Sequence, residues 1–65
     1  MKIIKNEPSI KTIELTNHEL LILNNILNEV CNGSYSIDDT EFGTLIGADK
    51  DEVLILLKEI GAMEL

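Results

Sequence analysis

One histidine and one cysteine are the residues of this chain most suited to nucleophilic, acid–base or soft-metal chemistry. His18 falls in the first turn of a predicted helix, without a partner that would orient it for proton transfer. Cys31 falls on the apolar side of the same helix and is typical of a buried small hydrophobe. One Cys and one His cannot supply four zinc ligands, and a lone Cys forms no intrachain disulfide. We therefore expect no enzyme activity, no metal and no cofactor.

The acidic segment "DDTEFG" (residues 38–43) has the outline of a calcium-binding loop, with Asp38 at its first position and Gly43 at its sixth. Phe42 occupies a position that would have to supply an oxygen ligand. Asp49 stands at the twelfth position, where such loops carry Glu. The sequence therefore predicts no calcium site here.

Charge separates the remaining classes of function. The chain has 12 acidic and 5 basic residues, a net charge of −7, and all five basic residues are lysines. Affinity for nucleic acid comes largely from Lys and Arg that neutralise phosphates, and Arg is the commonest reader of guanine. The composition therefore disfavours nucleic acid as a partner and favours a basic protein.

Membrane insertion and export are not expected either. The apolar stretches, such as Leu20 to Leu23 and the slightly longer Val53 to Leu57, are too short to span a bilayer. The opening "MKIIKNEPSI" lacks the long apolar region of an export signal, because Lys5 to Pro8 interrupt it. We expect a cytoplasmic protein with a reduced thiol.

Three helix-start signals organise the chain after an N-terminal extension at residues 1–15, in which "SIKTIEL" predicts a short strand. The signals are the capping boxes "TNHE", "DDTE" and "DKDE", which begin at residues 16, 38 and 49. Gly33, Gly47 and Gly61 follow the three helices as stop residues, with a left-handed turn expected at Gly33. "SYSI" (residues 34–37) and "AMEL" (residues 62–65) are predicted as short strands.

Apolar residues at helical spacing predict the core. On the first helix they cover about half of the circumference, and on the third they recur at i, i+3, i+4 and i+7. The predicted core residues are Leu20, Ile22, Leu23, Ile26, Leu27, Val30, Cys31, Phe42, Leu45, Ile46, Val53, Leu56, Leu57 and Ile60.

The segment "FGTLIGADKDEVLILLKEI" resembles the helix-turn-helix of bacterial regulators, with Gly47 in the turn, Asp49 as the cap and Val53 as the aliphatic packing position. The order of elements over residues 16–65 further resembles a winged-helix domain. The resemblance implies a mainly α, three-helix, helix-turn-helix-like domain with short β segments and without a full wing, since four residues follow Gly61. It implies a fold more than an activity.

Two outward faces are candidate partner-binding surfaces. The first helix presents several asparagines around an apolar residue, and the third presents an aliphatic residue among charges, a composition that suits a protein partner. The candidate residues are Leu21, Asn25, Asn28, Asp51, Ile55, Lys58 and Glu59.

Two functions follow from these features. The first is a small acidic protein-interaction module that binds another protein or a second copy of itself, such as an antagonist of a basic, nucleic-acid-handling partner. The alternative is a DNA-binding transcriptional regulator whose phosphate contacts come from lysines. The acidic start of the third helix, at Asp49, Asp51 and Glu52, favours the first. A domain this short buries only about 60% of its unfolded surface, which adds weight to self-association.

Overall fold

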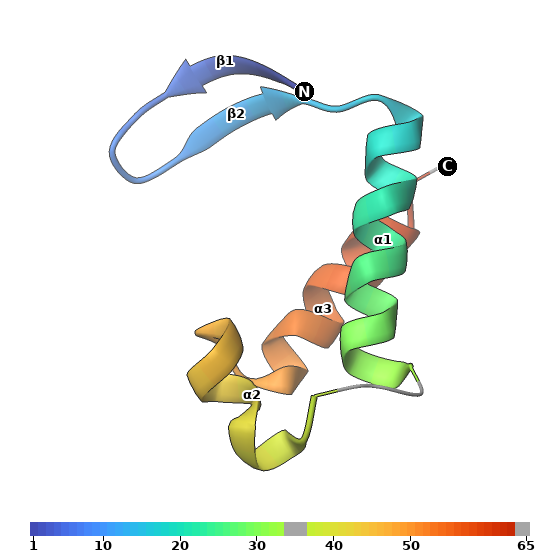
Figure 1. Cartoon of the computed structure of the whole chain (residues 1–65). Coiled ribbons are helices and arrows are strands. Elements are labelled where there is room, and N and C mark those ends of the chain that lie inside the picture. The colour runs from blue at the N-terminus through green and yellow to red at the C-terminus, as the bar shows by residue number, and fades with distance from the viewer. Residues whose placement is uncertain (34–36, 64–65) are drawn as a thin grey trace.

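The chain forms a β-hairpin followed by three helices in a computed structural model that describes residues 1–33 and 37–63 (Figure 1). The elements are β1 (Lys2–Asn6), β2 (Lys11–Glu14), α1 (Asn17–Asn32), α2 (Asp39–Ile46) and α3 (Lys50–Gly61). This is the mainly α architecture with a short β element that the sequence predicts.

The hairpin is larger than the single strand predicted from "SIKTIEL". β2 confirms that strand, and it pairs antiparallel with β1, which the sequence reading missed. Ile3 lies opposite Ile13, and the register shifts between Ile3 and Lys5, which marks a β-bulge. Around Pro8 the chain turns, and the Glu7 amide donates to the Ile10 carbonyl at 3.1 Å.

The described residues cover only part of the other two predicted strands, "SYSI" and "AMEL". Residues 34–36 of "SYSI" and residues 64 and 65 of "AMEL" lie outside the described part of the chain. Ala62 caps α3 and Met63 donates to the Ile60 carbonyl at 3.1 Å, so these two residues form a turn and not a strand.

The caps of the three helices agree with the sequence at their positions and differ in detail. Thr16 and Glu19 form the complete capping box of α1. Asp49 accepts from the Glu52 amide at 2.8 Å and caps α3. Asp38 caps α2 through the Thr40 amide at 3.3 Å, one residue earlier than a capping box would require.

Two of the three glycines that follow the helices do not act as expected. Gly47 adopts φ 85°, ψ 9°, the left-handed turn that joins α2 to α3. Gly33 is extended, at φ −74°, ψ 172°, so the predicted left-handed turn there is wrong. A Cβ at Gly33 would lie 2.7 Å from the Glu29 carbonyl oxygen, so glycine permits a close approach. Gly61 belongs to α3 and faces Asn24 of α1, where a Cβ would come within 3.5 Å.

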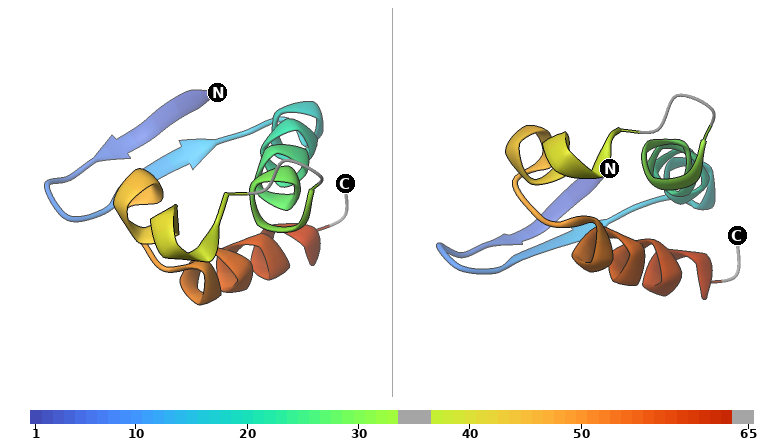
Figure 2. Two further views of the ribbon diagram at one scale, coloured as in Figure 1. Left: turned by 60° about the horizontal axis from the view of Figure 1, so that its bottom comes forward. Right: turned by 90° about the horizontal axis from the view of Figure 1, so that it is seen from below.

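The helices meet at a small cluster. Among the described residues, Cys31, Phe42 and Val53 are buried, at 6% exposure or less, and each comes from a different helix. Partly buried side chains surround the cluster: Leu27, Val30, Ile37, Ala48 and Leu54. Figure 2 shows α3 lying across both α1 and α2. A surface ion pair between Lys50 and Asp39, at 3.0 Å, joins the first turns of α3 and α2.

Much of the predicted core is exposed, which corrects the reading of the apolar stripes. The neighbouring helices leave these side chains more than one-third exposed. They are Ile22 (44% exposed), Leu23 (40%), Ile26 (52%), Leu45 (63%), Ile46 (43%) and Leu56 (48%). The stripes were identified correctly as apolar, but three short helices cover only part of their width.

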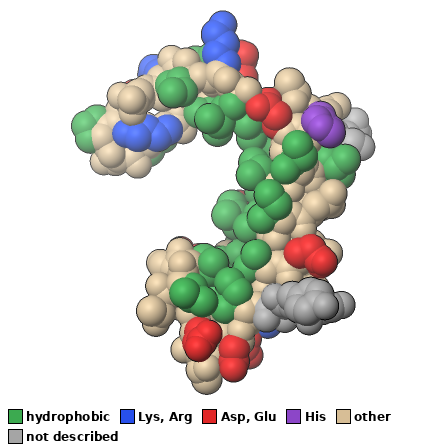
Figure 3. Space-filling view, in the orientation of Figure 1, with side chains coloured by type: hydrophobic (Ala, Val, Ile, Leu, Met, Phe, Trp, Pro, Cys, Tyr) green, Lys and Arg blue, Asp and Glu red, His purple; other side chains and the backbone are tan. Residues whose placement is uncertain are grey.

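The molecule is open because the hairpin stands away from the helices (Figures 1 and 3). Within the described residues, neither strand comes within 8 Å of a helix, Cα to Cα. The radius of gyration is 13.2 Å, against about 10.7 Å for a compact domain of this length. The accessible surface is 5267 Å², against about 4,100 Å² for a folded monomer of this mass.

Substitution of two glycines by alanine tests the backbone assignment. Gly47→Ala should destabilise the fold by about 1 kcal/mol, because an L-residue resists the left-handed conformation. Gly43→Ala should stabilise it by roughly 0.5–1 kcal/mol, because Gly43 lies within α2 with nothing near its missing Cβ. Urea unfolding followed by circular dichroism measures both. Changes of equal sign would contradict the assignment.

Two substitutions on α2 test the position of the core. Phe42→Ala should cost about 3–5 kcal/mol, enough to unfold much of so small a domain. Leu45→Ala, at 63% exposure, should cost well under half as much, although both residues were predicted to be buried. Thermal unfolding of the two variants measures both losses of stability. Equal losses would mean that α2 packs through Leu45 as well.

Candidate functional site

The residues suited to catalysis are separated in the structure. Cys31 is 2% exposed in the helical core, and His18 lies exposed in the first turn of α1. Across residues 1–33 and 37–63, no group of three His, Cys, Asp or Glu side chains is placed to hold a metal ion. None of the helices in those ranges is both long and apolar enough to cross a bilayer.

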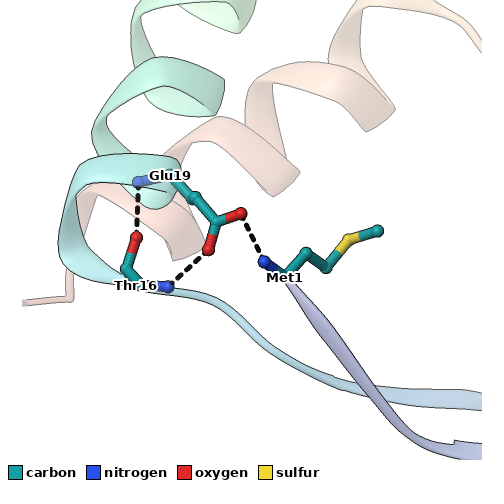
Figure 4. A network of polar contacts seen from close by, with 3 residues as sticks. All are labelled: Met1, Thr16 and Glu19. Atoms are coloured by element: carbon teal, nitrogen blue, oxygen red, sulfur yellow. Dashed lines mark hydrogen bonds and ion pairs between the residues drawn. The ribbon is translucent and has the colours of Figure 1, made fainter.

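A polar network joins the hairpin to α1 (Figure 4). Glu19 accepts from the Thr16 amide at 2.9 Å, and its own amide donates to the Thr16 hydroxyl at 3.1 Å. Its second carboxylate oxygen lies 2.6 Å from the amino group of Met1. The bond from that amino group, followed by the Thr16 hydrogen bonds, lowers the pKa of Glu19 from 4.5 to about 2. Glu19 thus caps the helix and ties the start of β1 to it.

A shallow hollow lies along α3. Ile55 and Leu56, at 61% and 48% exposure, form its apolar floor together with Val53 and Ala48. Glu52 lies about one helical turn before the two aliphatic residues, and Glu59 lies about one turn after them. The hollow has a volume of about 280 Å³. An apolar depression flanked by carboxylates suits an apolar side chain next to a basic one.

Of the third-helix residues singled out from the sequence, Ile55 and Glu59 line this hollow, whereas Asp51 and Lys58 are not among its lining residues. Asp51, Ile55, Lys58 and Glu59 are all exposed, as expected for an outward face. Leu54, the neighbour of Ile55 in the sequence, packs against the core and does not belong to that face. Sequence reasoning missed Leu56, because its place in the core stripe predicted burial, whereas its side chain is half exposed.

The first-helix residues form a separate stripe. Leu21 (43% exposed), Asn25 and Asn28 are exposed on the same side of α1, and the Asn32 amide donates to the Asn28 side chain at 3.3 Å. No hydrogen bond or ion pair among the described residues links this stripe to the outward face of α3. The two groups are therefore two surfaces on neighbouring helices.

Apolar side chains also gather on the inner side of the molecule, where Figure 3 shows them on the hairpin, along α1 and on α2 around a hollow. The sequence signal was present, since the apolar arc of α1 is broader than one neighbouring helix can cover. This whole arc was assigned to the core from the sequence, because periodicity shows which face of a helix is apolar but does not show what covers that face.

Comparisons with known proteins add no relative: the chain matches no family model, no curated protein and no solved structure.

The lowered pKa of Glu19 predicts how the stability of the fold depends on pH under acidic conditions. An unfolded chain would take up the Glu19 proton near pH 4.5, whereas the folded chain holds the carboxylate charged until about pH 2. Its stabilising effect should be complete above pH 4.5 and lost progressively as pH falls to 2. Glu19→Gln should remove this part of the acid dependence.

The measurement is urea unfolding of both proteins between pH 2 and pH 5, with a carbon-13 NMR titration of the Glu19 carboxyl. The free energy of unfolding of the variant should fall less over this range than that of the native chain. A Glu19 titration midpoint close to 4.5 would contradict the network.

Proposed function

We propose that this chain is a small acidic protein-interaction module and that the hollow along α3 is its docking site. The observation that carries the proposal is the pair Ile55 and Leu56, exposed side by side between Glu52 and Glu59. Surfaces that bind protein side chains combine an apolar centre with a polar rim.

The partner that this site fits carries a basic, amphipathic segment. Its apolar side chain would occupy the hollow, and its Lys or Arg would meet the two carboxylates at the rim. The net charge of −7 would increase the rate of encounter with such a partner. A partner that uses a basic surface to handle nucleic acid would lose access to that surface, and in this way the module would act as an antagonist.

A helix-turn-helix-like arrangement of α2 and α3 belongs to the same proposal. The left-handed Gly47 between the helices, the Asp49 cap and the buried Val53 support it. DNA recognition through α3 has less support, because Asp51 and Glu52 are exposed in its first turn. The nearby Lys50 is engaged by Asp39 at 3.0 Å. Carboxylates at this position would repel the phosphates that flank a groove.

A peptide-binding experiment tests the proposal. The probe is a synthetic amphipathic helix of Leu and Lys, added to the nitrogen-15-labelled chain in low salt. We expect amide shifts concentrated at residues 51–60, and an affinity that falls by about tenfold or more in Ile55→Lys, which places a cation in the hollow. Thr44→Lys, which adds the same charge at an exposed position of α2, is the matched control and should bind as the native chain does.

Two results would contradict the proposal. One is the absence of localised shifts with the basic peptide. The other is retardation of duplex DNA in a gel at low salt that weakens steeply as salt is added, because this pattern is the signature of phosphate contacts.

A further inference from the structure

Among the described residues, no helix packs against the strands of the hairpin. The hairpin side chains Met1, Ile3 and Ile13 are 73%, 63% and 43% exposed. These three residues line one apolar hollow of about 390 Å³ together with Asn6 and Lys11. A two-stranded hairpin is marginal in water without a third layer against its apolar face. The hairpin therefore needs a surface to cover.

A matching surface lies on α1. At about 100° per residue, Ile22, Leu23 and Ile26 fall within a 100° sector that also contains Glu19. Glu19 binds the amino group at the start of β1, so this sector lies on the side of α1 from which the hairpin departs. Figure 3 shows hydrophobic side chains on that inner side, facing the hollow below the hairpin. We call these α1 residues and the hairpin's Met1, Ile3 and Ile13 the concave face.

The chain exposes more surface than a compact monomer of its mass, and the excess is comparable to the area that one partner buries in a protein interface. The accessible surface of 5267 Å² exceeds the expected value for this mass by roughly 1,100 Å². A standard interface buries about 800 Å² on each partner. The uncovered surface is thus large enough for a stable dimer.

Charge is divided along the chain in a complementary way. Residues 1–14 contain three lysines against Glu7 and Glu14, which gives a side-chain charge of +1. Residues 15–65 contain two lysines against ten acids, which gives −8, and the two parts make up the net −7. A dimer in which the hairpin of each copy lies against the acidic helices of the other would offset part of the repulsion between two acidic chains.

We propose that the occupant of the concave face is a second copy of this chain. In a twofold-symmetric dimer, the hairpin of each copy enters the hollow of its partner, so that Ile3 and Ile13 cover the partner's Ile22, Leu23 and Ile26. Exchange of an identical element is a low-cost route to such a dimer. The concave face shares none of its residues with the α3 hollow, so this dimer and the proposed docking site succeed or fail separately.

The mass in solution is the first test. Light scattering after size exclusion should give twice the 7.2 kDa of one chain at micromolar concentration and above. Ile13→Asp and Ile26→Asp should each weaken dimerisation by about a hundredfold or more, because twofold symmetry places each new carboxylate in the interface twice. Both residues are exposed in the single chain, at 43% and 52%, so helical circular dichroism should persist.

Thr12→Asp is the matched control. Thr12 adjoins Ile13 on β2, points to the other face of the hairpin by strand alternation, and lies opposite Lys5. The control should remain a dimer. Monomeric native chain up to millimolar concentration, or equal weakening in Thr12→Asp, would overturn the proposal.

Isotope-filtered NMR on a mixture of labelled and unlabelled chains locates the interface. Intermolecular methyl contacts between Ile3 or Ile13 of one copy and Ile22 or Ile26 of the other are expected. The same contacts seen only within one chain would mean that the hairpin closes onto its own α1, and the dimer would be wrong. Intermolecular contacts confined to Ile55 and Leu56 would also overturn it.

Discussion

Three short helices can cover only a small amount of apolar surface, and this limit determines the rest of the structure. Cys31, Phe42 and Val53 form the buried centre, one residue from each helix, and partly buried aliphatics surround it. At about 25 cal/mol per Å² of buried apolar area, so few covered side chains leave little margin over the entropy of ordering 65 residues. Local interactions therefore matter more than usual: each helix begins with a side chain that caps its first turn.

The same constraint produces the surfaces on which function depends. An apolar stripe that is wider than its neighbouring helix leaves its flank uncovered. On α3 that flank presents Leu56 beside Ile55, and on α1 it presents Ile22 and Ile26. The two faces are chemically different, since carboxylates rim the first and a lysine-bearing hairpin overhangs the second. One short chain can thus carry two unrelated contact surfaces.

Sequence signals such as helix caps and turn glycines predicted the local structure, but they did not predict how the elements pack together. The caps at Thr16, Asp38 and Asp49 and the turn at Gly47 depend on neighbours within four residues, so the sequence located three helices closely. The strand β1 was missed because its identity depends on pairing with β2. For the candidate site, exposure of Ile55 was predicted from its position opposite the core stripe, whereas exposure of Leu56 depends on which helix packs where. Periodicity carries no information on that question.

The β-bulge between Ile3 and Lys5 bears on how far association of this chain can extend. Both edges of a two-stranded ribbon carry unpaired backbone groups, which are a template for strand-by-strand growth into fibres. A bulge twists the edge on which it lies, and Lys2, Lys5 and Lys11 place a charge at short intervals along the ribbon. Stacking of many ribbons would bring these ammonium groups together, so the ribbon can expose apolar side chains and still resist runaway polymerisation.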